Sequence, residues 1–294
     1  VIMATTSDAN ATQQLDRKYN VLFVAHLGQT EGGADRLLGM MITKLDHAKI
    51  SPMVLVPKDQ SLAKFLEESN IPFLVSPYKA WVGKSNNPIH KLYRLIFNAV
   101  ALMVLLYRLK SQHFDLIYTN SLYSPMGALL ARCLKTRHIW HIREFLEEDF
   151  GFQWDFGSER SLNFVDSVSD AIIINSHAVK QKWDPYLTSP QIHVIHSVIP
   201  REIGTAPQPR LTYHDPLQLC IVGNISIAKG QQEAIRALAL LHERGILARL
   251  NIAGRGDDAH IDALRAEAKQ LGVDTYISWL GFVEEIETVY DAAD

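Results

Sequence analysis

Short apolar runs alternate with stretches of helical spacing along most of the chain. Residues 21–26 form a continuous apolar run, and the stretch that follows places Leu38, Met41 and Leu45 at helical spacing. An apolar run of this length is typical of a buried strand, whereas apolar residues three and four positions apart are typical of an amphipathic helix. The pattern therefore predicts a strand, a loop and a helix over residues 21–45.

The same alternation continues and then restarts in the last third of the chain. It predicts further strands at 51–56, 71–76, 114–121, 138–142, 171–176, 192–198, 217–223, 247–254 and 275–281. Strands that alternate with helices pair in parallel and are covered on both faces. We therefore predict an α/β fold with two Rossmann-like sheets. The second has three strand–helix units, which is half of a doubly wound sheet.

Residues 200–216 separate these two sets of elements. The stretch PREIGTAPQPRLTYHDP holds four prolines and no apolar period, as interdomain linkers do. We predict a disordered lead-in at 1–19, an N-terminal domain at 20–199, a linker at 200–216 and an incomplete C-terminal domain at 217–294. The lead-in lacks the apolar segment of a signal peptide.

Composition and charge exclude several classes of protein. The chain is 47% hydrophobic and 21% charged, as soluble globular proteins are. Residues 1–200 carry 20 lysines and arginines against 18 acidic residues, and residues 201–294 carry 9 against 14. Neither part has the basic excess of a nucleic-acid-binding protein. We interpret Cys133 and Cys220, which lie in apolar stretches, as reduced core residues of a cytosolic protein.

The most apolar stretch is LIFNAVALMVLLY, at residues 95–107. Its 13 residues are too few to cross a bilayer, which takes about 20. Basic residues flank it on both sides, at Lys91, Arg94, Arg108 and Lys110. We favour a buried helix with solvated ends. The alternative is a helix that lies on an anionic membrane, with its basic residues at the headgroups.

The stretch CIVGNISIAKG, residues 220–230, has features of an anion-binding site. A strand that ends at Gly223, before a helix that begins near Gly230, places free backbone N–H groups at the carboxyl edge of a parallel sheet. Lys229 adds a full positive charge beside them. These groups suit a phosphate, and the alternative is an ordinary turn with a solvated lysine.

Two more glycine pairs follow predicted strands. In HLGQTEGGADR, Gly32 and Gly33 let the backbone approach a ligand, while Asp35 is interpreted as a charge of the first helical turn. In IAGRGDD, Gly254 and Gly256 could let the backbone approach a ring or ribose. Each pair could equally be a plain turn between strand and helix.

His141 ends the predicted strand at 138–142, where it could hydrogen-bond a substrate or exchange a proton. Most histidines are structural, and that alternative stays open. The acidic run Glu144–Asp149 could flank a divalent ion, but we favour a solvated helix face. The sequence contains no HExxH, CxxC or GxSxG, so it gives no support to zinc hydrolysis or serine-esterase chemistry.

Taken in order, these segments resemble those of retaining glycosyltransferases of family 4, over about residues 20–294. In the first part, the resembling segments are EGGADRLL, FDLIYTNS, IINSHAVKQKW and IHVIHSVIP. In the second part, they are VGNISIAKGQQEAIRAL, LNIAGRGDD and ISWLGFVEEIETVYDAAD. The last three match the family's GR-x-x-x-x-KG, G-x-G and F-x-G-x-V patterns loosely.

The resemblance implies two facing Rossmann-like domains in the GT-B arrangement. It implies transfer of a sugar, of the hexosyl type, from a nucleotide diphosphate to an acceptor hydroxyl with the anomeric configuration retained. By the same resemblance, Lys229 stabilises the leaving diphosphate, the loop of Gly32 and Gly33 meets phosphate or acceptor, and His141 contacts the sugar. The expected catalytic residues are Lys229 and His141. The expected donor- and phosphate-binding residues are Gly32, Gly33, Gly223, Asn224, Lys229, Gly254, Arg255 and Gly256.

The resemblance also sets the expected partners. No metal and no cofactor are needed besides the nucleotide-sugar donor, because cations and N–H donors of the protein can stabilise the departing diphosphate. The acceptor is a glycan or a lipid-linked glycan of cell-surface polysaccharide synthesis. The expected location is the cytoplasm, including the inner face of the membrane.

Two features depart from the family pattern. Asn224 stands where the family has an arginine, so a bidentate phosphate contact is missing, and Arg255 could replace it. The family's two glutamates, spaced eight apart, fall beyond the last residue of this sequence. Glu284, Glu285 and Glu287 do not reproduce them.

Two other functions stay open. A nucleotide-sugar epimerase of GT-B architecture would use cleft carboxylates such as Glu144 and Glu147. A chain with an incomplete second domain could instead be an inactive fragment that binds acceptor or partner. Nucleoside diphosphate binding separates the enzyme from the fragment.

Overall fold

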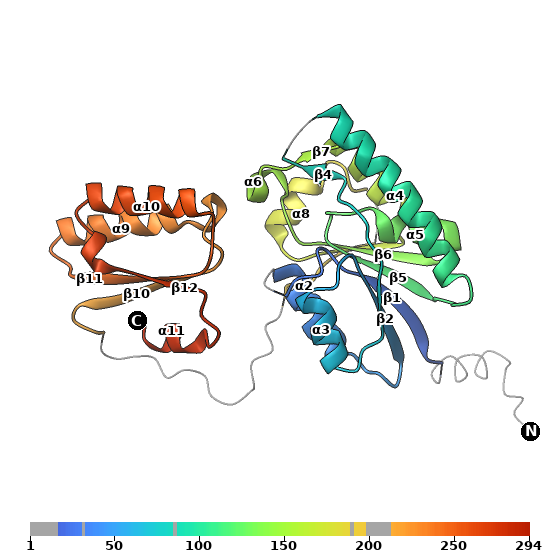
Figure 1. Ribbon diagram of the computed structural model, residues 1–294, viewed down its shortest axis with the longest axis horizontal. Helices are drawn as coiled ribbons and strands as arrows, with labels where there is room; N and C mark the ends of the chain where they lie inside the picture. Colours follow the sequence, from blue (N-terminus) through green and yellow to red (C-terminus); the bar gives the residue numbers. More distant parts are fainter. Residues whose placement is uncertain (1–16, 31–32, 85–86, 189–190, 198–212) are drawn as a thin grey trace, which may run out of the picture. The chain divides into compact units, whose positions relative to one another are not determined.

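The computed structural model describes residues 17–30, 33–84, 87–188, 191–197 and 213–294. They belong to two compact units, one within residues 1–201 and the other within residues 202–294. In both units, parallel strands form a sheet that carries helices on its faces (Figure 1). The predicted α/β class with two parallel sheets is confirmed.

In the described part of the first unit, seven parallel strands form one sheet. Their order is β3-β2-β1-β5-β6-β8-β9, so the direction of strand addition reverses between β1 and β5. The strands are β1 (Tyr19–Val24), β2 (Ile50–Val56), β3 (Phe73–Val75), β5 (Leu116–Asn120), β6 (Arg137–Ile142), β8 (Ala171–Ile174) and β9 (Ile192–Val194). Each overlaps an apolar run that predicted it.

Alternate residues of the central strands divide the core into two layers. Val21 and Phe23 of β1 pack with α2 and α3, whereas Leu22 and Val24 point to the opposite face and pack with α4 and α5. Figure 1 shows these helix pairs on the two faces of the sheet. The helices of this unit are α2 (Gly33–Thr43), α3 (Ser61–Glu68), α4 (Pro88–Leu109), α5 (Met126–Leu134), α6 (Glu147–Phe150), α7 (Ser158–Val168) and α8 (His177–Trp183).

A small antiparallel pair, β4 (Val82–Gly83) with β7 (Gln153–Trp154), was not predicted. Two-residue strands carry no periodic signal. The pair lies beside a buried cluster of tryptophans, in which the rings of Trp81 and Trp140 stack with centroids 5.8 Å apart. Val82 of β4 and Trp154 of β7 both belong to this cluster.

The second unit repeats the design on a smaller scale. Its described strands, β10 (Leu217–Val222), β11 (Ala248–Ala253) and β12 (Ile277–Gly281), are parallel and adjacent in sequence order. Helices α9 (Gln231–Glu243) and α10 (Asp258–Gln270) cover one face, and α11 (Glu287–Asp291) lies on the other (Figure 1). Two 3₁₀ turns, at Ile227–Lys229 and Asp274–Tyr276, complete the unit.

Two expectations are corrected and two lie partly outside the described residues. Both cysteines are free, but Cys133 is exposed on α5 and Cys220 is half-buried, so they are not core residues. The helix expected to be buried at residues 95–107 belongs to α4, whose 22 residues are mostly exposed. Residues 1–16 of the lead-in and 198–212 of the linker region are not among those that the structure describes.

Gly127 sets the distance between α5 and the sheet. A Cβ atom at this position would lie 2.1 Å from Oγ1 of Thr119 and 3.0 Å from Cγ2 of Val24. The Thr119 hydroxyl is held by Nε2 of His138 at 2.7 Å, so it cannot turn away without losing that bond. Only glycine fits without moving α5.

We expect Gly127→Ala to lower the free energy of unfolding by up to about 2 kcal/mol. Overpacking costs about 1–3 kcal/mol, and the roughly 1 kcal/mol that alanine gains over glycine inside a helix offsets part of that cost. Urea unfolding followed by tryptophan fluorescence measures the change. The control is Gly33→Ala, because a Cβ atom there meets nothing within 4 Å. Equal midpoints for the two variants would contradict the close packing of α5.

Candidate functional site

Polar side chains gather at the carboxyl ends of the strands in the first unit. His26 follows β1, Asn120 ends β5, His141 lies near the end of β6 and Asn175 follows β8. Ligands of open parallel sheets bind at this edge, beside the point where the strand order reverses. Here that point lies between β1 and β5.

Asp35 fixes the loop after β1. Its carboxylate accepts the backbone N–H groups of His26 at 2.7 Å, Leu27 at 2.8 Å and Gly28 at 2.7 Å, and its side chain is buried. Asn120 adds a fourth contact from Nδ2 at 3.3 Å. Asp35 does stand in the first turn of α2, as expected, but its carboxylate also holds the loop after β1 in place.

The glycine pair of this loop is only partly described. Gly32 lies outside the described residues. Gly33 is exposed at the start of α2, and a Cβ atom there would meet nothing within 4 Å. Packing in this unit does not require glycine at 33, so its proposed contact with a ligand stays a prediction.

His141 is buried, with one ring nitrogen engaged and the other free. Tyr118 bonds its Nδ1 through the phenol oxygen, and Nε2 has no partner among the described residues. Burial, with a smaller contribution from the Arg143 cation, lowers the pKa of His141 to about 3. Burial raises the pKa of Tyr118 to about 12, so the phenol keeps its proton. A phenol that donates to Nδ1 leaves the proton of the neutral ring on Nε2.

Arg143 connects three loops at this edge. Its Nε donates to Oδ1 of Asn120 at 2.8 Å, and its Nη1 donates to Oγ of Ser197 at 3.2 Å. Burial lowers the pKa of the guanidinium, against the attraction of neighbouring Tyr118, Glu144 and Asp35. These contacts hold the ends of β5 and β6 and the segment after β9 together.

Glu144 is buried and engaged. Its carboxylate accepts the hydroxyl of Ser121, the N–H of Leu122 at 2.5 Å and the N–H of Arg143 at 3.0 Å. Ser121 has a φ of 87°, a conformation that costs energy for a residue other than glycine. Burial raises the pKa of Glu144, while these hydrogen bonds act to lower it. The group therefore holds a strained turn.

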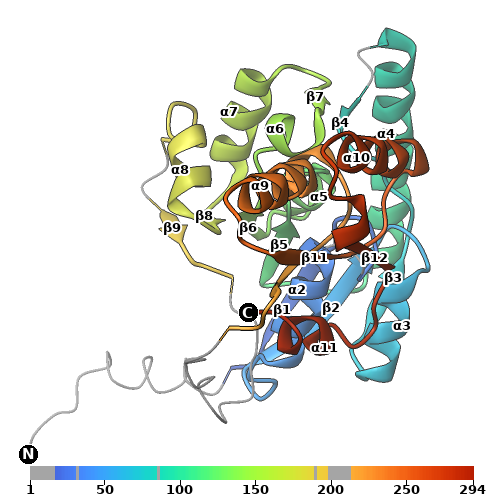
Figure 2. The ribbon, with the colours of Figure 1, turned by 90° about the vertical axis from the view of Figure 1, so that its left-hand side faces the viewer.

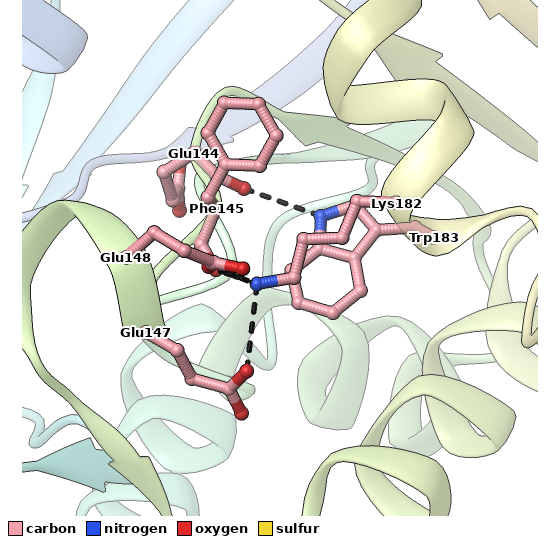
Figure 3. Close-up of polar contacts among 6 residues, drawn as sticks. All are labelled: Glu144, Phe145, Glu147, Glu148, Lys182 and Trp183. Carbon is pink, nitrogen blue, oxygen red and sulfur yellow. Dashed lines mark hydrogen bonds and ion pairs between the residues drawn. The ribbon is translucent and has the colours of Figure 1, made fainter.

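The rest of the acidic run is tied to α8 (Figure 3). Lys182 donates to the carbonyl of Phe145 at 2.8 Å and forms ion pairs with Glu147, at 3.4 Å, and with Glu148. The indole of Trp183 donates to the Glu144 carbonyl at 3.2 Å. The run is thus not a simple solvated helix face. Among the described residues, no group of acidic, histidine or cysteine side chains is arranged to hold a metal ion.

In the second unit, two glycine loops lie against each other. The N–H of Gly223 bonds the carbonyl of Ala253 at 2.9 Å, and the N–H of Ile225 bonds the carbonyl of Arg255 at 2.7 Å. A Cβ atom on Gly254 would lie 1.8 Å from the Gly223 oxygen, and one on Gly256 would lie 2.4 Å from the Ile225 oxygen. The two glycines therefore have a packing reason that the sequence did not reveal. A role in binding ribose stays a prediction.

Lys229 stands at the end of the first of these loops. It is exposed in the 3₁₀ turn before α9 and has no ion-pair partner among the residues that the structure describes. Buried Gln231 braces the loop, because its Nε2 donates to the Asn224 carbonyl at 3.1 Å and its Oε1 accepts the Ser226 N–H at 3.3 Å. The Arg255 guanidinium lies over the Phe282 ring, 4.8 Å from its centroid.

The structure thus brings the predicted residues together in two sets, one in each unit. Gly33 and His141 lie at the carboxyl edge of the first sheet, and the other described candidates lie at the carboxyl edge of the second. Sequence reasoning missed Tyr118 and Asn120 in the first set and Gln231 in the second. A usable signal was present for Tyr118 and Asn120, since they stand two residues apart at the end of a predicted strand and so face the same side.

Comparison with protein-family models gives two matches. Residues 31–202 match the model described as Glycosyltransferase Family 4, which covers more than half of the chain. The chain belongs to glycosyltransferase family 4. Residues 216–294 of this glycosyltransferase match the model described as glycosyl transferases group 1. A search of curated proteins finds no match.

Solved structures show that this family 4 glycosyltransferase has the GT-B fold. Anabaena Alr3699/HepE, in complex with UDP and glucose, aligns with a TM-score of 0.67 at 19% identity, over 94% of this chain and 72% of that chain. The lipopolysaccharide outer core galactosyltransferase WaaB aligns with a TM-score of 0.60 at 15% identity, over 92% of this chain and 70% of that chain. A mutant of S. aureus TarM aligns with a TM-score of 0.64 at 9% identity, over 94% of this chain and 80% of that chain.

We expect Asp35→Asn to lower the free energy of unfolding by about 1.5–3 kcal/mol, the range of a hydrogen bond to a charged group. The amide loses an acceptor and turns an NH₂ group toward backbone donors. Urea unfolding followed by tryptophan fluorescence measures it, because four of the five tryptophans lie in residues 1–201. Asp59→Asn, at an exposed site in the same unit, is the control. Similar losses in both variants would show that Asp35 does not anchor the loop.

We expect the ring of His141 to stay neutral in the folded protein down to a pH near its pKa of about 3. In the unfolded chain a histidine takes up a proton near pH 6.5. Its contribution to stability is therefore complete above pH 6.5 and decreases as the pH falls toward 3. Ring nitrogen shifts in NMR spectra at about pH 5 report the charge, with the urea-unfolded protein as control. A protonated His141 at that pH in the folded protein would show that the ring is not desolvated.

Proposed function

We propose that this glycosyltransferase moves a hexosyl group from a nucleotide diphosphate to an acceptor hydroxyl, with retention of the anomeric configuration. The observation that carries the proposal is Lys229, an exposed cation without an ion-pair partner among the described residues, at the start of α9. Departure of a nucleotide diphosphate develops negative charge, and a fixed cation beside it lowers the barrier.

The loop around Lys229 is suited to hold a diphosphate in place. Gln231 and the adjacent glycine loop fix its backbone before any ligand arrives. The first N–H groups of α9 carry the positive end of the helix dipole, which favours an anion. Anabaena HepE is described in complex with UDP-glucose, which supports a nucleotide-sugar donor for this chain too.

The proposed role of His141 is to donate a hydrogen bond from Nε2 to a hydroxyl of the transferred sugar. A ring with a pKa of about 3 is a poor base near neutral pH. The proton of the acceptor hydroxyl is therefore assigned to an oxygen of the leaving diphosphate. The new glycosidic bond forms as the bond to that diphosphate breaks. This scheme needs neither a metal nor a side-chain nucleophile.

The engaged carboxylates favour transfer over epimerisation. Glu144 accepts three hydrogen bonds, and Glu147 and Glu148 are ion-paired with Lys182. An epimerase would need carboxylates free to act on the nucleotide sugar. For the acceptor we propose a glycan or lipid-linked glycan of cell-surface synthesis, made on the cytoplasmic side. WaaB is described as a lipopolysaccharide galactosyltransferase, and TarM in a complex with fondaparinux, which supports a glycan acceptor.

We expect Lys229→Ala to weaken the binding of UDP or GDP by at least about tenfold, since a contact to a charged group contributes about 1.5–3 kcal/mol. Isothermal titration calorimetry measures the affinity. Lys269→Ala, in the last turn of α10, is the matched control and should leave the affinity unchanged.

Two results would contradict the proposal. Equal affinities for wild type and Lys229→Ala would remove Lys229 from the site. Binding of neither nucleotide to the wild type would favour the inactive fragment. The anomeric proton coupling of a product made from mixed UDP-sugars and GDP-sugars then tests retention.

A further inference from the structure

Helix α4 presents an apolar stripe to solvent along its whole length. Large apolar residues at spacings of three and four lie on this outer face and are 50–73% exposed: Ile89, Leu92, Ile96, Val100, Met103 and Tyr107. Eighteen residues of helix rise about 27 Å. Figures 1 and 2 show α4 along the outside of the first unit. A soluble surface seldom carries so long an apolar stripe without a partner.

The opposite face of α4 fixes the helix to the protein. Leu105 and Leu109 are fully buried in the core beneath it. Asn98 holds both the N–H and the carbonyl of Lys79, at 2.8 Å and 3.1 Å, and Arg94 is paired with Asp155. Among the described residues, α4 is the one helix whose length and apolar content would suffice to cross a bilayer. Its inner face, however, is packed against the rest of the first unit.

An apolar groove runs along each side of this ridge. One, of about 540 Å³, is lined by Leu95 and Leu102 of α4 together with Leu129 and Phe164. The other, of about 390 Å³, is lined by Tyr93 and Val104 of α4 and by residues before it.

The ridge lies in a segment with only positive charge. Residues 69–114 contain six lysines and arginines and no aspartate or glutamate, in a chain whose net charge is −3. Lys84 and Lys110, at the two ends of α4, are exposed. A two-fold contact between copies of the chain through this face would bring the same basic residues together. An anionic surface would neutralise them.

We propose that the outer face of α4 docks on a bilayer that contains anionic phospholipid. The apolar stripe enters the region between headgroups and acyl chains, and the flanking lysines contact the headgroups. Tyr93 and Tyr107 are amphipathic residues of the kind found at such interfaces. This assignment is independent of the proposed sugar transfer, because none of these residues belongs to the candidate sites.

Co-sedimentation with lipid vesicles tests the proposal. The wild type should bind vesicles of phosphatidylcholine mixed with phosphatidylglycerol more strongly than vesicles of phosphatidylcholine alone. The variant Ile89→Gln/Met103→Gln/Tyr107→Gln should lower the partition into mixed vesicles by at least about tenfold, because interfacial binding scales with buried apolar area. The control variant Leu240→Gln/Leu271→Gln removes exposed apolar residues of the second unit and should bind as the wild type does.

Charge and self-association are tested separately. Lys84→Gln/Lys110→Gln should reduce the preference for mixed vesicles, and equal binding of the wild type to both vesicle types would overturn the anionic assignment. Sedimentation velocity without lipid should show the same species for wild type and triple variant. A dimer that the triple variant dissociates would overturn the proposal in favour of a second copy. UDP titration and near-UV circular dichroism should be unchanged in all variants, which separates failure of docking from failure of the donor site or of folding.

Discussion

At the carboxyl edge of a parallel sheet the strand ladder stops, and the backbone N–H groups of each loop need new acceptors. The two units meet this requirement differently. In the first, the buried Asp35 carboxylate accepts three loop N–H groups, so an acidic side chain closes the loop. In the second, the acceptors are neutral carbonyls of the neighbouring loops and the amide of Gln231. Closing this loop therefore takes no charged side chain, and Lys229 is left exposed without an ion-pair partner among the described residues, while Glu233 stands in the first turn of α9.

At the first edge, groups of opposite charge lie close together. His141 is held uncharged by burial and offers one nitrogen, and the Arg143 charge faces Asp35 and Glu144 nearby. The two edges thus differ in charge because an acidic side chain closes the loop in the first unit, whereas neutral groups close the loops in the second.

The strand pattern was readable because buried parallel strands are short apolar runs, and alternation with helices settled their direction. The loop contacts of Asp35 were not predicted, because an acidic residue in a first helical turn already has a local explanation and its partners depend on how the loop folds back. Gly254 and Gly256 need their neighbours in space to be understood. The exposure of α4 could not be predicted, since an apolar helical sequence does not show whether protein, lipid or solvent lies against the helix. The apolar stretch at residues 95–107 is only 13 residues long, whereas the helix that contains it has 22 residues.

The paired glycine loops of the second unit restrict which residues can stand at positions 254 and 256. A methyl group at 254 or 256 would overlap a backbone oxygen of the adjacent loop, so almost every point mutation there displaces the segment that carries the lysine. Asn224 and Arg255 stand in the same loops but are exposed, and the Arg255 guanidinium lies over the Phe282 ring. A change at 224 or 255 therefore alters an exposed side chain and leaves the packing of the two loops intact, whereas a change at 254 or 256 alters that packing itself.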